Sequence, residues 1–459
     1  MSEGLQNVLA IGTLLAVIAL VLARLPKVDV GHSKEFTRRR FLNWFPLGLT
    51  YSFLYMGRYN LTVAKNALGD LMTIEDFGHI TAAGSIVYGV AFVINGPLAD
   101  RIGGRRTTLI AAAGAAIANL LMGAVLLFKH TSNLGLTYMI LYSLNMYFQS
   151  FGAVSIVKVN AHWFHLRERG SFGGIFGILI SLGIYFAFDW GKMIVTAFPV
   201  EWVFFIPAAI LLVFFVIDYF LVHDTPSETG HPDFDTADAT WGGDGPRLSV
   251  WVIGKMMLTN RTILTIAAIE FCSGFVRKSM MDWYSVYATK TGIADTLLPA
   301  HWGLVQCIAG ILGGVLAGLI SDRVFGARRG PVAVMLYGVM FAGSIAAFFA
   351  LGYGALGWIV VVMMLSVIGV HGMLSGTASM DFGGKKNVGV AVGLIDGFVY
   401  LGVGAQALFL GNVLPDGAAA ANPLNWKAWP LAMAPVALVG FLLATRLWNA
   451  RPQNNSAAH

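Results

Sequence analysis

Two short stretches that echo each other decide the fold: GPLADRIGGRR at Gly96–Arg106 and GLISDRVFGARRG at Gly318–Gly330. Each reads glycine, three residues, Asp-Arg, and then glycine with paired arginines. An aspartate at a helix end can pair with nearby arginines and with the N-terminus of a neighbouring helix. The echo predicts a chain of two related halves, with a switch motif at the same place in each half.

The composition outside these stretches is that of a membrane protein. Of the 459 residues, 57% are hydrophobic and only 12% are charged, whereas soluble domains carry about 25% charged residues. Continuous apolar runs of about 20 residues recur, which is the length that crosses the hydrocarbon core as a helix. The runs do not alternate in the way that barrel strands do. The sequence therefore predicts an all-α membrane protein.

The predicted spans divide evenly around one polar segment. They lie near 5–24, 41–65, 77–98, 107–128, 135–157, 171–193, 201–222, 262–287, 300–320, 331–352, 356–378, 388–411 and 429–448. The long polar segment 223–249 is rich in Pro, Gly and Asp and is typical of a linker. The first span lacks a basic region ahead of it and is too long for a signal peptide, so we interpret it as an anchor.

These boundaries predict the organisation of the chain. We expect an extra N-terminal membrane helix with a basic cytoplasmic linker at 1–40, a six-helix bundle at 41–222, a cytoplasmic linker at 223–261, a second six-helix bundle at 262–448 and a cytoplasmic tail at 449–459.

The positive charges indicate an orientation. The net charge of +6 does not imply nucleic-acid binding, because membrane proteins gather Lys and Arg in cytoplasmic loops. Basic clusters fall at 24–40, 101–106, 158–169, 247–261, 323–329, 385–386 and 446–451, all on one predicted side. We therefore expect the N-terminus outside and the C-terminus in the cytoplasm of a cell inner membrane.

The doubled motif resembles the loop between the second and third helices of the major facilitator superfamily. This resemblance implies two six-helix bundles that rock between two states. The residues that match the conformational-switch motif are Gly96, Asp100, Arg101, Arg105, Asp322 and Arg323.

A charged stripe lies in the second predicted span. Helical spacing places Tyr51, Tyr55, Thr62 and Lys65 on the same face as Arg58. A buried arginine is costly and marks a functional site by default. The stripe predicts a helix face that lines a water-filled cavity.

The second half supplies a matching arginine. Arg277 lies in the helix that opens this half, at nearly the same interval as the one that separates the two switch motifs. Guanidinium groups grip phosphate or carboxylate with a planar fork of donors. Two such groups facing one cavity favour a dianion. In the alternative interpretation the arginines pair with acids in or near the spans, which are Glu270, Asp282, Asp396 and Asp189.

Five further stretches narrow the resemblance: YMGRYN, RKSMMDWYSVY, HWFHLRERG, HDTPSETGHP and GGKKNVGVAVGLIDGFVYLG. They resemble the organophosphate:phosphate antiporters, over residues 41–448. The resemblance implies alternating access, exchange of inorganic phosphate for an organophosphate, and anion binding by Arg58 and Arg277. It also implies binding roles for Tyr51, Tyr55, Tyr88 and Tyr400.

The chain departs from this family at basic positions. Tyr59 stands where the glycerol-phosphate carriers have lysine, Phe92 where the family has a lysine in the next helix, and Ile180 near a family histidine. Lys65, Lys278 and His371 can replace part of this charge. The departures favour a less charged or more apolar anion.

Two acids inside spans complete the set of candidate residues. Glu270 and Asp396 either carry a coupled proton or neutralise the nearby cations when the site is empty. The H-x-x-H of His162 and His165 lacks further ligands, so we expect no metal and no other cofactor. No catalytic motif is present, and we do not expect an enzyme.

We therefore predict a monomeric transporter, surrounded by membrane lipid, that carries a small anionic molecule with or without inorganic phosphate and has no nucleic-acid partner. Two rival functions remain open. One is a proton-coupled organic-anion symporter or exporter on the same fold, and the other is a transporter-like sugar-phosphate sensor.

Overall fold

The computed structural model describes residues 3–25, 30–165, 168–236, 259–326, 328–374 and 388–449. Every regular element in these ranges is helical. This confirms the predicted fold class.

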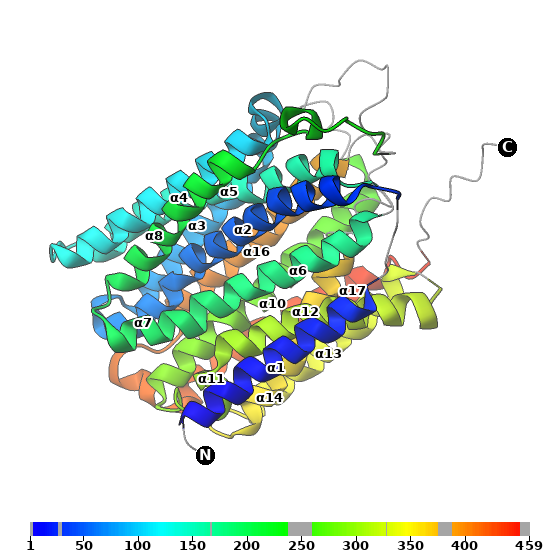
Figure 1. Cartoon of the computed structure of the whole chain (residues 1–459). Helices are drawn as coiled ribbons and strands as arrows, with labels where there is room; N and C mark the ends of the chain where they lie inside the picture. The colour runs from blue at the N-terminus through cyan, green and yellow to red at the C-terminus, as the bar shows by residue number, and fades with distance from the viewer. Residues whose placement is uncertain are drawn as a thin grey trace. The chain divides into compact units, whose positions relative to one another are not determined.

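The helices of the first half begin with α1 (Glu3–Arg24), the extra N-terminal helix (Figure 1). The others are α2 (Lys34–Leu68), α3 (Ile74–Ile102), α4 (Gly104–Leu127), α5 (Leu134–Trp163), α6 (Arg169–Tyr185), the π-helical turn η3 (Phe186–Trp190), α7 (Gly191–Ala197) and α8 (Trp202–Leu221).

The second half follows a short 3-10 turn, η4 (Pro226–Thr229). Its helices are α10 (Arg261–Lys290), α11 (Leu297–Ala300), α12 (Trp302–Val324), α13 (Arg329–Phe349), α14 (Ala355–His371), α16 (Val388–Val413) and α17 (Ala428–Thr445).

The helices differ in whether they are long and apolar enough to cross a membrane. In the described part of the chain, 10 helices are long and apolar enough to cross a membrane, and the apolar part of α1, Ile11–Ala23, is shorter. The predicted spans 41–65 and 262–287 are not among the 10. They correspond to α2 and α10, which carry Arg58 and Arg277, so the two arginines lie on the more polar helices of the molecule.

The contacts divide the chain into two compact units. Unit 1 comprises Met1–Thr73, Ile94–Trp241 and Asp295–Ile311, and unit 2 comprises Ile74–Val93, Gly242–Ala294 and Leu312–His459. Both α3 and α12 are split between the units, so the first half of each packs with the other half of the sequence. The predicted bundles, with boundaries at 41–222 and 262–448, remain a prediction.

Close helix packing in unit 1 depends on small residues. α4 packs against α5 and α8, while α2 packs against α6 and α8 (Figure 1). A Cβ atom on Gly114 of α4 would lie 2.1 Å from the ring of Phe148 on α5. Because no side chain fits there, glycine lets the two helices approach each other closely.

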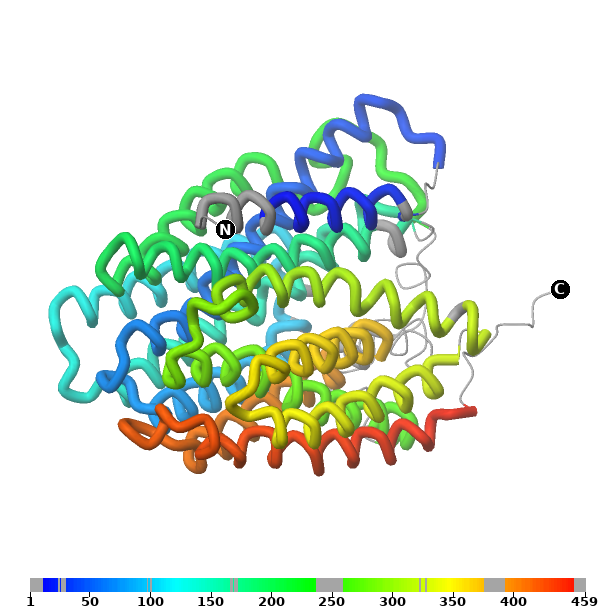
Figure 2. The backbone as a smooth tube through the Cα atoms, turned by 90° about the horizontal axis from the view of Figure 1, so that it is seen from below, coloured from blue at the N-terminus to red at the C-terminus, as the bar shows by residue number. Residues whose placement is uncertain are grey.

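In unit 2, one glycine on α10 and one on α16 let these two helices approach each other closely. A Cβ atom on Gly274 would lie 2.1 Å from the carbonyl oxygen of Val399, and one on Gly402 would lie 2.0 Å from that of Phe271. α17 packs alongside α13 and α10, and Figure 2 shows α17 in red near the end of the chain. These contacts make α10 the central helix of the unit.

An aspartate caps each of the two split helices. In unit 2, Asp416 accepts a hydrogen bond from Ile74 N at 2.7 Å, at the start of α3. In unit 1, Asp189 accepts from Gly303 N at 2.8 Å and Leu304 N at 3.0 Å, at the start of α12. A carboxylate at this place satisfies unpaired amides and complements the helix dipole.

The extra helix α1 is packed into unit 1. Leu14 and Val21 are 4% and 7% exposed, and they form one apolar cluster with Ile178 of α6 and with Cys307 and Ile311 of α12. α1 therefore covers the place where α6 and the first half of α12 lie together.

Candidate functional site

The side chain of Arg58 is held inside unit 1. It is 1% exposed. Its Nε donates to Oε1 of Gln149 at 2.9 Å, and its guanidinium carbon lies 4.7 Å from the centre of the Tyr55 ring. Gln149 and Tyr55 are neutral, and a guanidinium stays protonated in proteins. These two contacts position the guanidinium of Arg58.

Side-chain amides from α4 and α5 surround the backbone of α2 beside this arginine. Asn145 and Asn119 both donate to the carbonyl oxygen of Gly57, at 2.9 and 3.1 Å. Gln149 donates to Asn145 at 3.2 Å, and Asn60 donates to Asn119 at 2.8 Å. Buried amides are costly unless they are bonded, so this amide network fixes α2 at one point.

The sequence reasoning missed the amide network. Its members are separated by up to 91 positions along the chain, so no local spacing joins them. The available signal was the presence of Asn and Gln within otherwise apolar spans.

Two tyrosines of the predicted polar stripe of α2 are neighbours, and Tyr59, which was not predicted on the stripe, contacts one of them. The ring centroids of Tyr51 and Tyr55 are 5.2 Å apart, and those of Tyr55 and Tyr59 are 5.6 Å apart. Lys65 is 1% exposed, and its Nζ donates to the carbonyl oxygen of Gly69 at 3.0 Å. Lysine near a helix C-terminus commonly satisfies the last carbonyls, so part of the role of Lys65 is to end α2.

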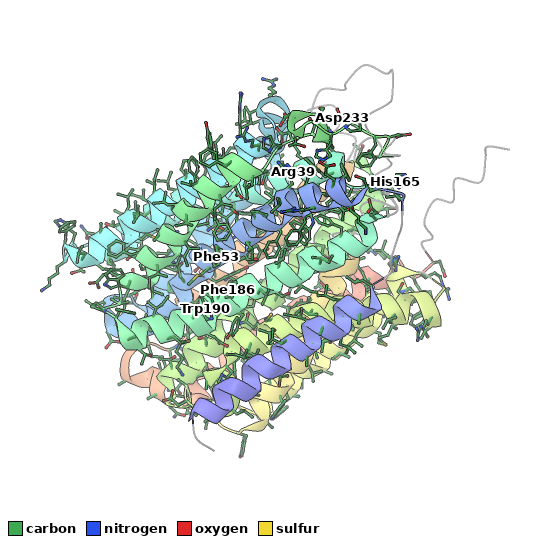
Figure 3. All side chains as sticks on the ribbon, in the orientation of Figure 1. Arg39, Phe53, His165, Phe186, Trp190 and Asp233 are labelled. Carbon is green, nitrogen blue, oxygen red and sulfur yellow. The ribbon has the colours of Figure 1, made fainter. Side chains whose placement is uncertain are left out.

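A different face of α2 is aromatic and apolar. Phe53 stacks on Phe186 of η3 at 5.3 Å, and Phe186 contacts Trp190 at 4.3 Å (Figure 3). This packing separates the apolar side of α2 from the side that carries the arginine.

Arg277 lies half-buried in the middle of α10, in unit 2. Its neighbour Lys278 forms an ion pair with Asp282, with 2.9 Å between Nζ and Oδ1 and side-chain exposures of 8% and 1%. This contact occupies one of the acids that the alternative interpretation assigned to the arginines.

Glu270, the second of those acids, contacts a histidine. Its Oε2 lies 2.8 Å from Nδ1 of His371, the last residue of α14, and its side chain is 0% exposed while that of His371 is 27% exposed. The structure thus joins two residues that the sequence placed in separate roles, Glu270 in coupling or neutralisation and His371 in anion binding.

Gln406 of α16 is a buried polar residue that the sequence reasoning did not single out. Its Oε1 accepts hydrogen bonds from Trp283 Nε1 at 2.9 Å and from Ser279 Oγ at 3.3 Å, both on α10. The contact fixes α16 against the part of α10 that follows Arg277.

The predicted tyrosines of α3 and α16 meet within unit 2. The ring centroids of Tyr88 and Tyr400 are 4.0 Å apart, and Tyr88 stacks on Phe92 at 5.9 Å. Asp396 lies half-buried one helical turn before Tyr400. These residues come together although 312 positions lie between the two tyrosines in the sequence.

The switch motif is described in part. Gly96 is half-buried, Arg101 and Arg323 are exposed, and the side chains of Asp100 and Asp322 lie outside the described residues.

Arg105, the remaining switch residue, contacts the start of the linker. Its backbone N donates to Oδ1 of Asp224 at 2.7 Å, and its guanidinium donates to the carbonyl oxygen of Tyr219. Further along the linker, Phe234 packs edge-on against Phe36 of α2. The first part of the predicted linker is therefore folded against unit 1.

The H-x-x-H of His162 and His165 has no further metal ligands among the described residues. Among the described residues, no group of three or more His, Cys, Asp and Glu side chains is arranged to hold a metal ion.

A comparison with known protein families matches most of the helical part of the chain. Residues 47–407 match the Major Facilitator Superfamily, and the chain belongs to this superfamily of membrane transport proteins.

Its relatives fall in the narrower family that the sequence resembles. The chain is 26% identical to a glycerol-3-phosphate transporter of Bacillus subtilis, over 90% of this chain and 93% of the relative. It is 24% identical to a probable hexose phosphate transport protein of Chlamydia trachomatis (92% and 93%) and 24% identical to the membrane sensor protein UhpC of Salmonella typhimurium (84% and 88%). The predicted resemblance to the organophosphate:phosphate antiporters is confirmed.

Solved structures agree on the fold. A bacterial homologue of the human lysosomal transporter Spinster matches with a TM-score of 0.69 and 12% identity, over 91% of this chain and 98% of the other. The nucleoside transporter NupG matches with a TM-score of 0.59 and 14% identity, over 88% and 100%. The chain is a multi-pass membrane protein of the transporter class, in agreement with the prediction that it is not an enzyme.

Proposed function

We propose that this protein is a secondary active transporter of a phosphorylated or other organic anion, which it exchanges for inorganic phosphate by alternating access. Arg58 and Arg277 bind the anion. The relatives named as glycerol-3-phosphate and hexose phosphate transporters support the substrate class.

The observation that carries the proposal is the environment of Arg58. The side chain is 1% exposed, and its contacts with Gln149 and Tyr55 position its guanidinium. A buried arginine in a membrane protein marks a functional site by default, and a guanidinium recognises phosphate oxygens well. Tyr51, Tyr55, Tyr88 and Tyr400 supply hydroxyl groups suited to the same ligand.

The membrane arrangement belongs to the proposal as well. We propose that the C-terminus lies in the cytoplasm and the N-terminus lies outside the inner membrane, and the basic clusters support this orientation. The protein acts as a monomer, and Lys65 and His371 add positive charge to the anion site.

Exchange in liposomes tests this function. Purified protein in phosphate-loaded liposomes should take up labelled phosphate, glycerol-3-phosphate or a hexose phosphate only when phosphate is present inside. Arg58→Ala and Arg277→Ala should each lower uptake at least about 30-fold, since losing a buried charged contact costs about 2 kcal/mol or more. Arg38→Ala, which removes an exposed arginine of the same helix α2, is the matched control and should transport normally.

Three outcomes would redirect the proposal. Full uptake by both arginine variants would overturn the two-arginine site. Uptake driven by a pH gradient without internal phosphate would favour a proton-coupled symporter. Binding of a sugar phosphate without any transport would favour a sensor, as the relative UhpC is named.

A further inference from the structure

The contact between Glu270 and His371 joins two helices of unit 2 across 101 positions of sequence. Glu270 is 0% exposed on α10, and the His371 side chain is 27% exposed at the end of α14. The carboxylate is therefore enclosed, while the imidazole is the member of the pair that can exchange with its surroundings.

The chemistry of the pair fixes where a proton is gained or lost. An ionised carboxylate only accepts hydrogen bonds, so Nδ1 of His371 carries a hydrogen and donates to Oε2 of Glu270. The second ring nitrogen, Nε2, is then the position that binds or releases a proton. Histidine is the side chain whose ordinary charge change falls between pH 5 and 8.

The helices packed around this pair carry the other titratable groups of the region. α12 packs on α14 where Gly313 meets Gly369, and this part of α12 carries Asp322 and Arg323. α14 carries no other titratable residue than His371, and α17 carries none. α13 contributes Arg329 and Tyr337, whose hydroxyl donates to the carbonyl oxygen of Ile269 at 2.5 Å. α16 contributes Asp396 and Tyr400. The remaining groups are on α10 itself: Arg261, Cys272, Arg277, Lys278, Asp282, Tyr284, Tyr287 and Lys290.

Glu270 and Arg277 lie on the same helix. Glu270 precedes Arg277 by two helical turns, about 10 Å along the axis, and charges at that distance interact appreciably in a membrane interior. Lys278 and Asp282 form an ion pair on the same helix, and Asp396 of α16 carries a further carboxylate. A proton on His371 neutralises the Glu270–His371 pair and so makes the surroundings of Arg277 more positive by one charge.

We propose that the Glu270–His371 pair is a proton-binding site linked to anion binding, so that a proton enters at Nε2 of His371 when a phosphate anion binds. The inference rests on the proposed transport function. The proton supplies positive charge in place of one of the basic residues that the family has where this chain has Tyr59, Phe92 and Ile180. Because linkage is reciprocal, anion affinity rises as the pH falls, by up to about tenfold per pH unit for one linked proton.

Calorimetric titration of inorganic phosphate into the protein in nanodiscs tests this site. The titrations are run between pH 6 and 8 in two buffers with different heats of ionisation, so that the heats report protons taken up per phosphate bound. The ionisation of phosphate itself is the same for every variant, and differences between variants therefore report the protein. The wild type should take up more protons than His371→Gln, in which glutamine can still donate to Glu270.

A second variant and a control sharpen the measurement. Glu270→Gln removes the negative charge that Arg277 otherwise balances, so its phosphate affinity at pH 8 should be at least about threefold higher than that of the wild type. His130→Gln, which changes an exposed loop histidine, should behave as the wild type does.

The outcomes separate the two proposals. If phosphate does not bind to the wild type at any pH, the proposed function fails. If phosphate binds and the wild type and His371→Gln take up equal numbers of protons, the proton site is overturned while the function stands.

Discussion

Arg58 and Arg277 lie in the helices that open the two halves of the chain, α2 and α10. The buried polar side chains that contact these two helices differ in kind. Around Arg58, unit 1 uses neutral amides, namely those of Asn60, Asn119, Asn145 and Gln149. On the helix that carries Arg277, unit 2 has ionisable pairs, Lys278–Asp282 and Glu270–His371. The helices that carry the two arginines therefore differ in their buried polar contacts, which are neutral in unit 1 and ionisable in unit 2.

The difference has a functional consequence. The amides of unit 1 keep the same charge at every physiological pH, and so does the guanidinium of Arg58. Ionisable pairs let the net charge of unit 2 change by a proton without moving a helix. In this transporter the first half would provide a constant anion contact, and the second half would provide an adjustable one.

The largest expected effect comes from breaking the ion pair of unit 2. Lys278→Met leaves Asp282 buried without its partner, and breaking a buried pair costs about 3–5 kcal/mol. Thermal unfolding in detergent should show a large decrease in the free energy of unfolding. The double variant Lys278→Met with Asp282→Leu should recover most of it, and a single variant as stable as the wild type would show that the pair is not a structural element.

Removing the centre of the amide network should have a smaller effect. Asn119→Ala deletes hydrogen bonds to Gly57, Ala115 and Asn145, and unsatisfied buried groups cost about 1–3 kcal/mol. The same unfolding measurement checks this value. Asn133→Ala is the control, since its exposed side chain makes no capping hydrogen bond. Equal stability of the two variants would argue against a structural role for the network.

Replacing each arginine with lysine tests the difference between the environments of Arg58 and Arg277 directly. Arg58→Lys keeps the charge but loses the Nε contact with Gln149 and the planar group that lies over Tyr55. A hydrogen bond from a charged group is worth about 1.5 kcal/mol or more, so phosphate exchange should fall about tenfold. Arg277→Lys should lose less, because a point charge suffices among ionisable pairs. The reverse order in liposome exchange rates would contradict the comparison.

The smallest expected effect concerns a feature that the units share. Asp189→Ala and Asp416→Ala each remove the cap of a split helix, α12 in unit 1 and α3 in unit 2, at a cost of about 1 kcal/mol each. Unfolding of each variant should shift slightly and by similar amounts. A large shift for only one of them would show that the caps differ as the arginine sites do.

Much of the fold could be predicted from sequence because its signals are local. The duplicated Asp-Arg motif, the apolar runs and the placement of Lys and Arg are visible within stretches of about 20 residues. The stripe of Arg58, Tyr51 and Tyr55 follows from the helical repeat alone. The ion pair of Lys278 with Asp282 is also an i,i+4 contact, so the sequence contained that signal too, although the interpretation assigned Asp282 to the arginines.

The partners of the other buried polar groups were decided by tertiary structure. Glu270 was expected to carry a proton or neutralise its helix neighbours, which stays a prediction, and packing of α14 on α10 brings His371 to it. Packing of α4 and α5 on α2 likewise brings the amides to Arg58.

The sequence by itself determined that this chain is a helical transporter of the Major Facilitator Superfamily with an arginine inside the helix that opens each half, because hydrophobicity, charge placement and short motifs act locally. Only the tertiary structure decided that the first halves of α3 and α12 pack with the opposite parts of the chain, and which neutral or ionisable groups surround each arginine. Those choices depend on contacts between helices hundreds of residues apart, where burial makes every polar group take whichever partner the packing provides.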